Sequence, residues 1–453
     1  MSIPAPSPVG RNLGALGAVI LRGGRVLGDE AADIRLTAEG RIAAIRPTGT
    51  DTAPVPCIDI DGLVVLPAFV DLHTHLREPG SEDSETIASG TRAAAAGGFS
   101  DVFAMANSRP VTDTPDRVSW IARTAARVGA ARVHPVGAIT TNLEGTSPAP
   151  LAAMAKTGAR MFSDDGRCVD DADILRRALL AARTSGTVIA QHAQCRHLAG
   201  QGQVNAGPAA ERTGLTPWPH VAEETVVARD VILAGESGGR LHVCHVSTAG
   251  TVGIVRWAKN NGWPVTAEVA PHHLLLTDDL ASDANPLYKV NPPLRSATDV
   301  KVLRSALRDG TIDAVATDHA PHTSRSKAAD WCHAPFGMLG LEAALSVVAE
   351  VLRRDGAPDW PRIAQVMSHQ PARIGSLDTA GRPLTAHEPA TFTLVDPQAD
   401  WQVDPLDLHS LSHNTPFTAR VFHNRVKATV VDGHVTHDAA GLLRTTTDEE
   451  SPR

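Results

Sequence analysis

The chain has 453 residues and a formal net charge of −8, with 42 basic and 50 acidic side chains scattered rather than grouped in blocks. This length suits one large domain and a smaller one, and the 42% hydrophobic content is ordinary for a soluble globular protein. The scattered charge argues against a nucleic-acid partner, and no apolar run approaches the roughly 18 residues that a membrane span needs.

The two ends of the chain share a pattern of short apolar strands separated by turns. Near the N-terminus the runs are AVILRGGRVL, DIRLTAEGRIAAI and CIDIDGLVVL, and near the C-terminus they are TFTLVDPQADWQV and VKATVVDGHV. Apolar alternation between glycine-containing turns predicts strands. We therefore expect residues 1–64 and 385–453 to form one small β-sandwich domain.

Between these ends, short apolar runs alternate with helical stretches. Eight candidate strands follow one another: LVVLPAFVDL, DVFAMA, VHPVGAI, ARMF, VIAQ, LHVCH, VTAEVA and DAVAT. Helices are expected between them, for example over 173–184, 221–234 and 299–308, the last capped by Gly310. Eight such units predict an α/β fold of the TIM (β/α)8 barrel type over residues 65–384.

Polar side chains stand where six of these strands end. Because the C-terminal ends of barrel strands open onto one face, these side chains are expected to converge on a single site. They are His73 and His75, Asn107, the pair Asp164 and Asp165, His192, His245, and Asp318.

The residue types in this set are typical metal ligands. Zinc prefers imidazole and carboxylate, and for amide chemistry it supplies a Lewis acid and lowers the pKa of bound water to about 7. In DLHTHL, His73 and His75 are two apart on one strand, so both side chains project to the same side. The segment FSDDG offers Asp164 or Asp165 as a bridge between two metals, and the pattern leaves that choice open.

Eight phrases occur along the chain in this order: DLHTHLREPG, AMANSRP, FSDDG, HVCHVSTAGTV, TAEVAPHHL, VNPPLR, ATDHAPHT and APFG. The set resembles the bacterial class I dihydroorotases of the amidohydrolase superfamily, over about residues 19–433. The resemblance implies a hydrolase that interconverts N-carbamoyl-L-aspartate and L-dihydroorotate through zinc-activated hydroxide, in de novo pyrimidine (UMP) biosynthesis.

The resemblance also implies the roles of individual residues. Two zinc ions per chain are expected, with Asp318 as the catalytic acid/base. The implied metal ligands are His73, His75 and Asp318 on one ion, His192 and His245 on the other, and Asp165 between them. The implied substrate-binding residues are Arg77, Asn107 and His322 for a carboxylate, and Asn291, Phe336 and Gly337 for the ring amides.

The polar stretch HAPHTSRSKAADW, residues 319–331, follows the last barrel strand. It lacks a strand or helix pattern, so we expect a mobile loop that brings His322 over the substrate. An arginine such as Arg77 suits a carboxylate because its planar guanidinium donates two parallel hydrogen bonds.

Two other functions fit the sequence less well. A hydantoinase or allantoinase would bridge its metals with a carbamylated lysine after the fourth strand, whereas ARMFSDDG contains no lysine. A non-catalytic scaffold for aspartate transcarbamoylase typically loses the HxH pair, which is present here. The chain also departs from the family at Ala68, at Ala106 and at Gln194, which follows His192 where a glutamate is usual.

The number and spacing of the cysteines indicate the cellular compartment of the protein. Cys57, Cys168, Cys195, Cys244 and Cys332 are odd in number, far apart and without a CxxC pair, which favours a reducing environment. We therefore expect a cytoplasmic protein. The resemblance further implies a homo-oligomer, with an aspartate transcarbamoylase complex as a possible assembly.

Overall fold

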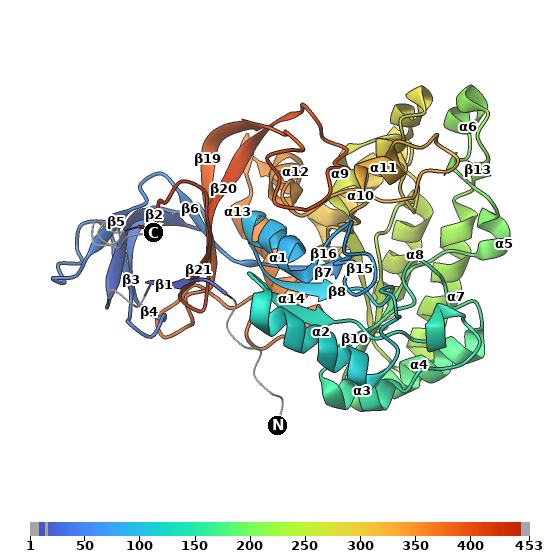
Figure 1. Cartoon of the computed structure of the whole chain (residues 1–453), viewed down its shortest axis with the longest axis horizontal. Coiled ribbons are helices and arrows are strands. Elements are labelled where there is room, and N and C mark those ends of the chain that lie inside the picture. The colour runs from blue at the N-terminus through green and yellow to red at the C-terminus, as the bar shows by residue number, and fades with distance from the viewer. Residues whose placement is uncertain (1–8, 14–16, 445–453) are drawn as a thin grey trace.

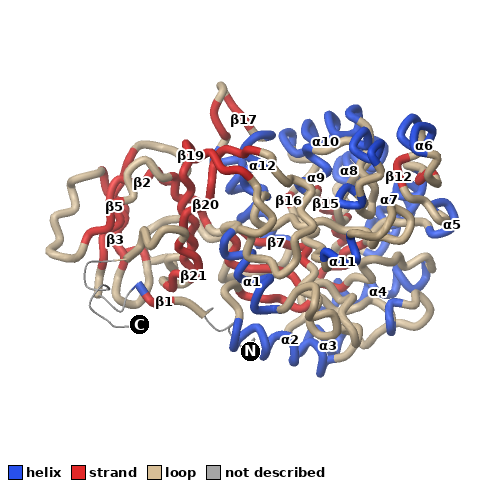
Figure 2. The backbone as a smooth tube through the Cα atoms, turned by 45° about the horizontal axis from the view of Figure 1, so that its top comes forward, coloured by secondary structure: helices blue, strands red, loops and turns tan. Residues whose placement is uncertain are grey.

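The computed structural model of the chain describes residues 9–13 and 17–444. It has a β-rich part, in which segments from the two ends of the chain lie side by side, and a larger part of strands and helices (Figure 1). Figure 2 shows the helices at the periphery of the larger part, with strands at its middle. The fold is therefore mixed α/β.

The β-rich part is one sheet of nine strands in the order β1-β21-β20-β19-β6-β2-β3-β4, with β5 added beside β2. Both chain ends enter one apolar core, which contains Leu21 and Ile34 as well as Phe392 and Val430. The strands are β1 Arg11–Asn12, β2 Val19–Val26, β3 Ala31–Leu36, β4 Ile42–Pro47, β5 Cys57–Asp59, β6 Val64–Pro67, β19 Phe392–Gln402, β20 Val421–Val431 and β21 His434–Asp438.

The larger part contains eight strands in two parallel sheets, β7-β8-β9 and β10-β11-β14-β15-β16. Two isolated parallel bridges join the sheets, one between Gly137 and Phe162 and one between Thr74 and His319. The strands are β7 Phe69–Thr74, β8 Phe99–Ala104, β9 Arg132–Pro135, β10 Met161–Phe162, β11 Val188–Gln191, β14 Leu241–Val243, β15 Val265–Val269 and β16 Ala314–Val315.

One predicted strand is two strands in the structure. The run LVVLPAFVDL was expected to form a single strand, but β6 ends at Pro67 and β7 begins at Phe69. β6 pairs with β19 in the nine-stranded sheet, whereas β7 pairs with β8. An unbroken apolar run cannot by itself reveal this division, because both halves are fully buried.

Helices connect the successive strands of the larger part. Those predicted over 173–184, 221–234 and 299–308 are present as α4, α7 and α10, and Gly310 caps α10 in the left-handed conformation. The longer helices are α1 Ile87–Ala96, α2 Pro115–Val128, α3 Leu151–Thr157, α4 Ala172–Ser185, α7 Val221–Ser237, α8 Ala249–Asn260, α10 Ala297–Asp309 and α12 Ala344–Val351. None of the helices in the described ranges is both long and apolar enough to cross a membrane.

Shorter elements complete the loops. The stretch 319–331 was expected to lack helix, but the short helix α11 forms there. The Thr323 side chain caps this helix by accepting a hydrogen bond of 3.2 Å from the N–H of Ser326. The short elements are α5 Arg196–Ala199, α6 Pro208–Thr213, α9 Pro271–Leu275, α11 Ser324–Lys327, α13 Trp360–Ala364, α14 Gln370–Ile374, β12 Val204–Asn205, β13 Pro217–Trp218, β17 Arg353–Arg354, β18 Ala357–Pro358, the 3-10 helices Thr141–Leu143, Asp278–Asp283 and Pro286–Tyr288, and the π-helical turn Gln365–His369.

Candidate metal centre

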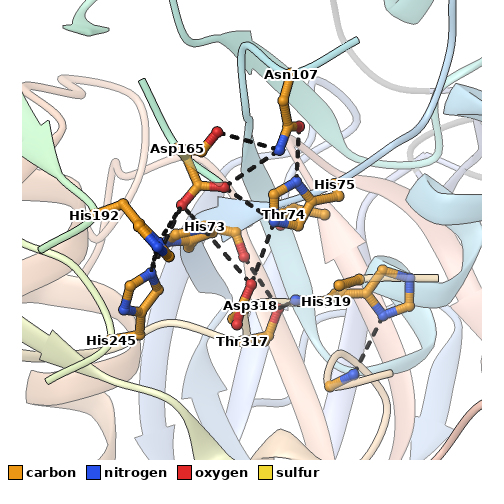
Figure 3. Close-up of polar contacts among 12 residues, drawn as sticks. His73, Thr74, His75, Asn107, Asp165, His192, His245, Thr317, Asp318 and His319 are labelled. Atoms are coloured by element: carbon orange, nitrogen blue, oxygen red, sulfur yellow. Dashed lines mark hydrogen bonds and ion pairs between the residues drawn. The ribbon is translucent and has the colours of Figure 1, made fainter. Parts of the chain in front are cut away.

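Six buried side chains from five parallel strands point toward one another (Figure 3). Each stands at or just after the C-terminal end of a parallel strand, so the strand order brings together residues as far apart in sequence as 73 and 318. They are His73 and His75 at β7, Asp165 after β10, His192 after β11, His245 after β14 and Asp318 after β16.

The Asp165 carboxylate is at the centre of this cluster. Its Oδ1 lies 3.1 Å from Nε2 of His73, 3.3 Å from Nδ1 of His192 and 3.6 Å from Nε2 of His245. Its Oδ2 lies 3.4 Å from Nε2 of His75. One carboxylate therefore faces four imidazoles, three through Oδ1 and one through Oδ2.

The neighbouring Asp164 has a different surrounding. Its Oδ1 accepts hydrogen bonds from the backbone N–H groups of Ile139 and Thr140 at 2.8 and 2.9 Å, and its Oδ2 accepts one from the Thr140 hydroxyl. Asp164 thus holds the loop after β9, and Asp165 is the aspartate of the pair that faces the histidines. Sequence spacing alone left these two residues equivalent.

Asp318 closes the cluster on the side of β7. Its Oδ1 lies 3.3 Å from Nε2 of His75 and 3.6 Å from Nε2 of His73. The backbone of Asp318 is left-handed, with φ 47°, as is that of His245 at 31° and of Arg77 at 59°. Non-glycine residues adopt this region at a cost, and they gather at sites whose geometry the surrounding fold enforces.

The donor set fits a divalent cation. Nε2 of His73 and Oδ1 of Asp165 are both buried, and neither has a hydrogen-bond partner, although they are only 3.1 Å apart. Buried polar atoms without a partner are costly unless something else satisfies them. Two groups around Asp165 have ligand atoms close enough to share an ion: His73, His75 and Asp165, and Asp165, His192 and His245.

The contacts between Asp165 and the histidines also shift the pKa values of these groups. Burial alone would raise the pKa of Asp165, but the charge of His73 and the nearby ring nitrogens of the other histidines lower it well below its usual value. Burial would likewise lower the pKa of His73, but Asp165 raises it. The cluster therefore keeps Asp165 ionised, which is the form that binds metal.

Three residues that the sequence reasoning missed stand behind His73. Its Nδ1 donates to Oε1 of Glu268 at 3.0 Å, and Oε2 of Glu268 accepts from Nε2 of His242 at 2.9 Å. His73, Glu268 and Cys244 also form a third buried group with metal-ligand spacing. A carboxylate inside the apolar strand VTAEV was the available signal, because a buried charge there needs partners.

Gln194 occupies the equivalent place behind His192. Its Oε1 lies 2.9 Å from Nε2 of His192 and also accepts a hydrogen bond of 2.9 Å from Nδ2 of Asn291. Since the amide oxygen only accepts, Nε2 of His192 carries a proton, and Nδ1 is the ring nitrogen that faces Asp165. This contact links a candidate ligand to a candidate substrate residue.

Arg77, His322 and Gly337 lie together beside the cluster. Nε of Arg77 donates to the carbonyl of Pro321 at 3.0 Å, and its Nη2 is 3.3 Å from Nε2 of His322. Nε2 of His322 is 2.8 Å from the carbonyl of Phe336. Burial and the Arg77 charge lower the pKa of His322 to about 3, so its imidazole is neutral. A Cβ at Gly337 would lie only 2.9 Å from Nε2 of His322.

Asn107 has contacts that were not anticipated. Its Oδ1 accepts from Nδ1 of His75 at 3.0 Å, and its Nδ2 lies 3.4 Å from Oδ2 of Asp165. In this structure Asn107 therefore orients a candidate ligand. Its expected contact with a substrate carboxylate stays a prediction.

The chain is similar to known proteins in both sequence and fold. The sequence profile of the dihydro-orotase-like family matches residues 62–251. The chain is 51% identical to a dihydroorotase of Streptomyces coelicolor over 92% of this chain and 99% of that protein, and 49% identical to a dihydroorotase of Mycobacterium tuberculosis over 92% and 98%. Among solved structures, it is similar to an L-hydantoinase from Arthrobacter aurescens with a TM-score of 0.81 at 26% identity, covering 93% and 96% of the two chains. It is also similar to a dihydropyrimidinase from Brevibacillus agri, with a TM-score of 0.79 at 22% identity over 93% and 95%.

Proposed function

The chain belongs to the dihydroorotase family, and on that premise we propose that it interconverts L-dihydroorotate and N-carbamoyl-L-aspartate in pyrimidine biosynthesis, as a zinc-dependent cyclic amidohydrolase. The observation that carries this proposal is the position of Asp165 between two pairs of histidines, with Arg77 and His322 beside them. A metal-ligand set next to a guanidinium suits a cyclic amide that bears a carboxylate.

Two zinc ions per chain are proposed for the cluster. His73, His75 and Asp318 would hold one, His192 and His245 the other, and Asp165 would bridge them. When bound, zinc would activate water at neutral pH and polarise a substrate carbonyl. The unpartnered atoms of His73 and Asp165 support this fit. The buried Glu268 and the half-buried Gln194 support it too, because each holds the far nitrogen of a candidate ligand.

Asp318 is proposed as the acid/base. Its carboxylate would take a proton from the attacking water and deliver it to the ring nitrogen as the amide bond breaks, and the reverse sequence would close the ring. Arg77, Asn107 and His322 would hold the substrate carboxylate. Asn291 and the backbone at Phe336 and Gly337 would hold the ring amides.

The architecture that carries this site is proposed to be a closed (β/α)8 barrel with a β-sandwich domain. The bridges Gly137–Phe162 and Thr74–His319 support closure, since they join the two parallel sheets at both edges. The boundaries proposed from sequence were 1–64 with 385–453 and 65–384. Because β6 pairs with β19, we move the first boundary to just after Pro67.

A cytoplasmic location, inferred from the cysteines, remains a proposal. A homo-oligomer and an association with aspartate transcarbamoylase, inferred from the family, remain proposals too. The test of the function itself is turnover of L-dihydroorotate by the purified, zinc-loaded protein, compared with a hydantoin and allantoin. We expect turnover of dihydroorotate and little of the other two. A folded, zinc-loaded protein that turned over only the hydantoin would replace this proposal with the activity named for its structural neighbours.

A further inference from the structure

Two lysines are buried near the mouth of the site, where the mechanism above assigns them no part. Lys289 is 2% exposed and Lys327 is 5% exposed. Within the described chain, neither ammonium group forms an ion pair with a carboxylate. A buried charge costs free energy unless hydrogen bonds satisfy it, so each lysine needs another kind of partner.

The partners of Lys289 are backbone carbonyls on the opposite segment. Nζ of Lys289 donates to the carbonyls of Trp331 at 2.7 Å, Cys332 at 3.3 Å and Ala334 at 2.7 Å. Three donors are therefore matched by three acceptors. The ammonium also stands 4.4 Å from the centre of the Phe336 ring.

Lys327 makes the reciprocal connection from α11. Its Nζ donates to the carbonyls of Pro286 at 2.8 Å, Lys289 at 3.2 Å and Pro335 at 3.0 Å. The backbone N–H of Gly337 donates to the carbonyl of Lys289 at 3.0 Å. Each lysine thus extends from its own segment into the other.

The two segments joined in this way carry proposed substrate contacts. Residues 286–291 lead to Asn291, and residues 319–337 contain His322, Phe336 and Gly337. We propose that Lys289 and Lys327 form a reciprocal clamp that holds these two segments at the spacing required to bind substrate. They are positioning residues, and the inference rests on the proposed function because it uses its substrate contacts.

The charge of the clamp also influences the site. Burial, Arg77 and Lys327 together lower the pKa of His322, which keeps this imidazole neutral beside a guanidinium. Burial and the neighbouring Lys289 lower the pKa of Lys327 to about 7.

The test replaces each lysine by methionine, which keeps the apolar stem and removes the three donors. Lys301→Met on the surface of α10 is the matched control. For the zinc-loaded Lys289→Met and Lys327→Met proteins, we expect KM for L-dihydroorotate to rise about tenfold or more, since each variant loses hydrogen bonds to a charged donor. We expect kcat within about threefold of the parent, a reasonable limit for a change that leaves the reacting groups in place. The zinc content should not change.

A second readout separates a clamp from a general loss of stability. Hydrogen exchange of the zinc-loaded proteins should accelerate in 286–291 and 319–337 together in either variant, and not in the β-rich part. An unchanged KM in folded variants would overturn the inference. Variants that fail to fold would overturn it too, because the loss of a clamp outside the hydrophobic core should leave the protein able to fold. If the parent protein does not turn over dihydroorotate, the proposed function fails, while the exchange result still decides whether the clamp exists.

Discussion

Oε1 of Glu268 lies 3.0 Å from Nδ1 of His73, on the side of the imidazole opposite Asp165. A carboxylate at this distance accepts a hydrogen bond from Nδ1, so Nε2 is the ring nitrogen directed at the cluster. The far oxygen of Glu268 is held in turn by His242 at 2.9 Å. This buried chain sets both the tautomer and the orientation of a candidate ligand.

Replacing Glu268 by glutamine should therefore weaken metal binding. The amide can no longer accept equally from both histidines, and we expect zinc affinity to fall by roughly 10- to 100-fold. Zinc competition with a chromophoric chelator measures the effect. The surface variant Glu236→Gln is the control. Equal zinc affinity in the two variants would show that Glu268 does not support metal binding.

The Asp318→Asn protein should lose turnover in both directions. An amide cannot exchange the proton, so we expect kcat to fall by roughly 10²- to 10⁴-fold for ring opening and ring closure alike. The exposed Asp309→Asn serves as the control, with zinc content measured for each protein. Near-parental turnover by a zinc-loaded Asp318→Asn protein would contradict the acid/base role.

Arg77→Met tests the recognition of the carboxylate. Loss of a charge-assisted pair should raise KM for L-dihydroorotate by roughly 10- to 100-fold. Dihydrouracil, which has the same ring without the carboxylate, should be processed no worse than by the parent. A similar loss on both compounds would mean that Arg77 maintains the fold of the site rather than selecting the anion.

Arg132→Met should destabilise the protein strongly. Arg132 donates to Asp101 at 3.0 and 2.8 Å, and from β9 it also contacts Asp432 in the β-rich part at 2.7 Å. Removing it leaves the fully buried Asp101 carboxylate without its main partner, which costs about 3–5 kcal/mol in the free energy of unfolding. Urea unfolding measures this cost. The double variant Asp101→Asn with Arg132→Met should recover part of the loss, and a single variant as stable as the parent would contradict the argument.

The same pair predicts how stability depends on acid. Burial alone would raise the pKa of Asp101, but Arg132 and His134 lower it well below its usual value. A carboxyl with a depressed folded pKa contributes its full stability above the unfolded pKa of about 3.9 and loses it as the pH falls toward the folded pKa. The stability difference between the parent and Asp101→Asn should therefore shrink below about pH 4. A constant difference down to pH 2 would count against this assignment.

Much of this arrangement could be read from the sequence because it depends on local patterns. Alternating strands and helices predicted the positions of β8, β11 and α4, and polar residues at strand ends predicted which side chains would meet. The choice between Asp164 and Asp165 could not be made, since it depends on the backbone N–H groups of the loop after β9.

Other features depend on contacts distant in sequence. The division of LVVLPAFVDL into β6 and β7 follows from pairing with β19, more than 300 positions away in the chain. Lys289 and Lys327 were missed because a charged residue in a loop gives no sign of its own burial. Glu268 was missed although its place inside the apolar strand VTAEV was such a sign. Their partners are a histidine of another strand and the carbonyls of another loop, which only the fold brings near.

The central claim is that the cluster around Asp165 binds two zinc ions and thereby acts on L-dihydroorotate. Its most direct test is to add zinc stepwise to the metal-free protein while following dihydroorotate absorbance. The account predicts that turnover rises with added zinc and reaches a plateau at two ions per chain, and that Asp165→Ala abolishes the response. Full turnover by metal-free protein, or a zinc-loaded protein inert on dihydroorotate, would contradict it.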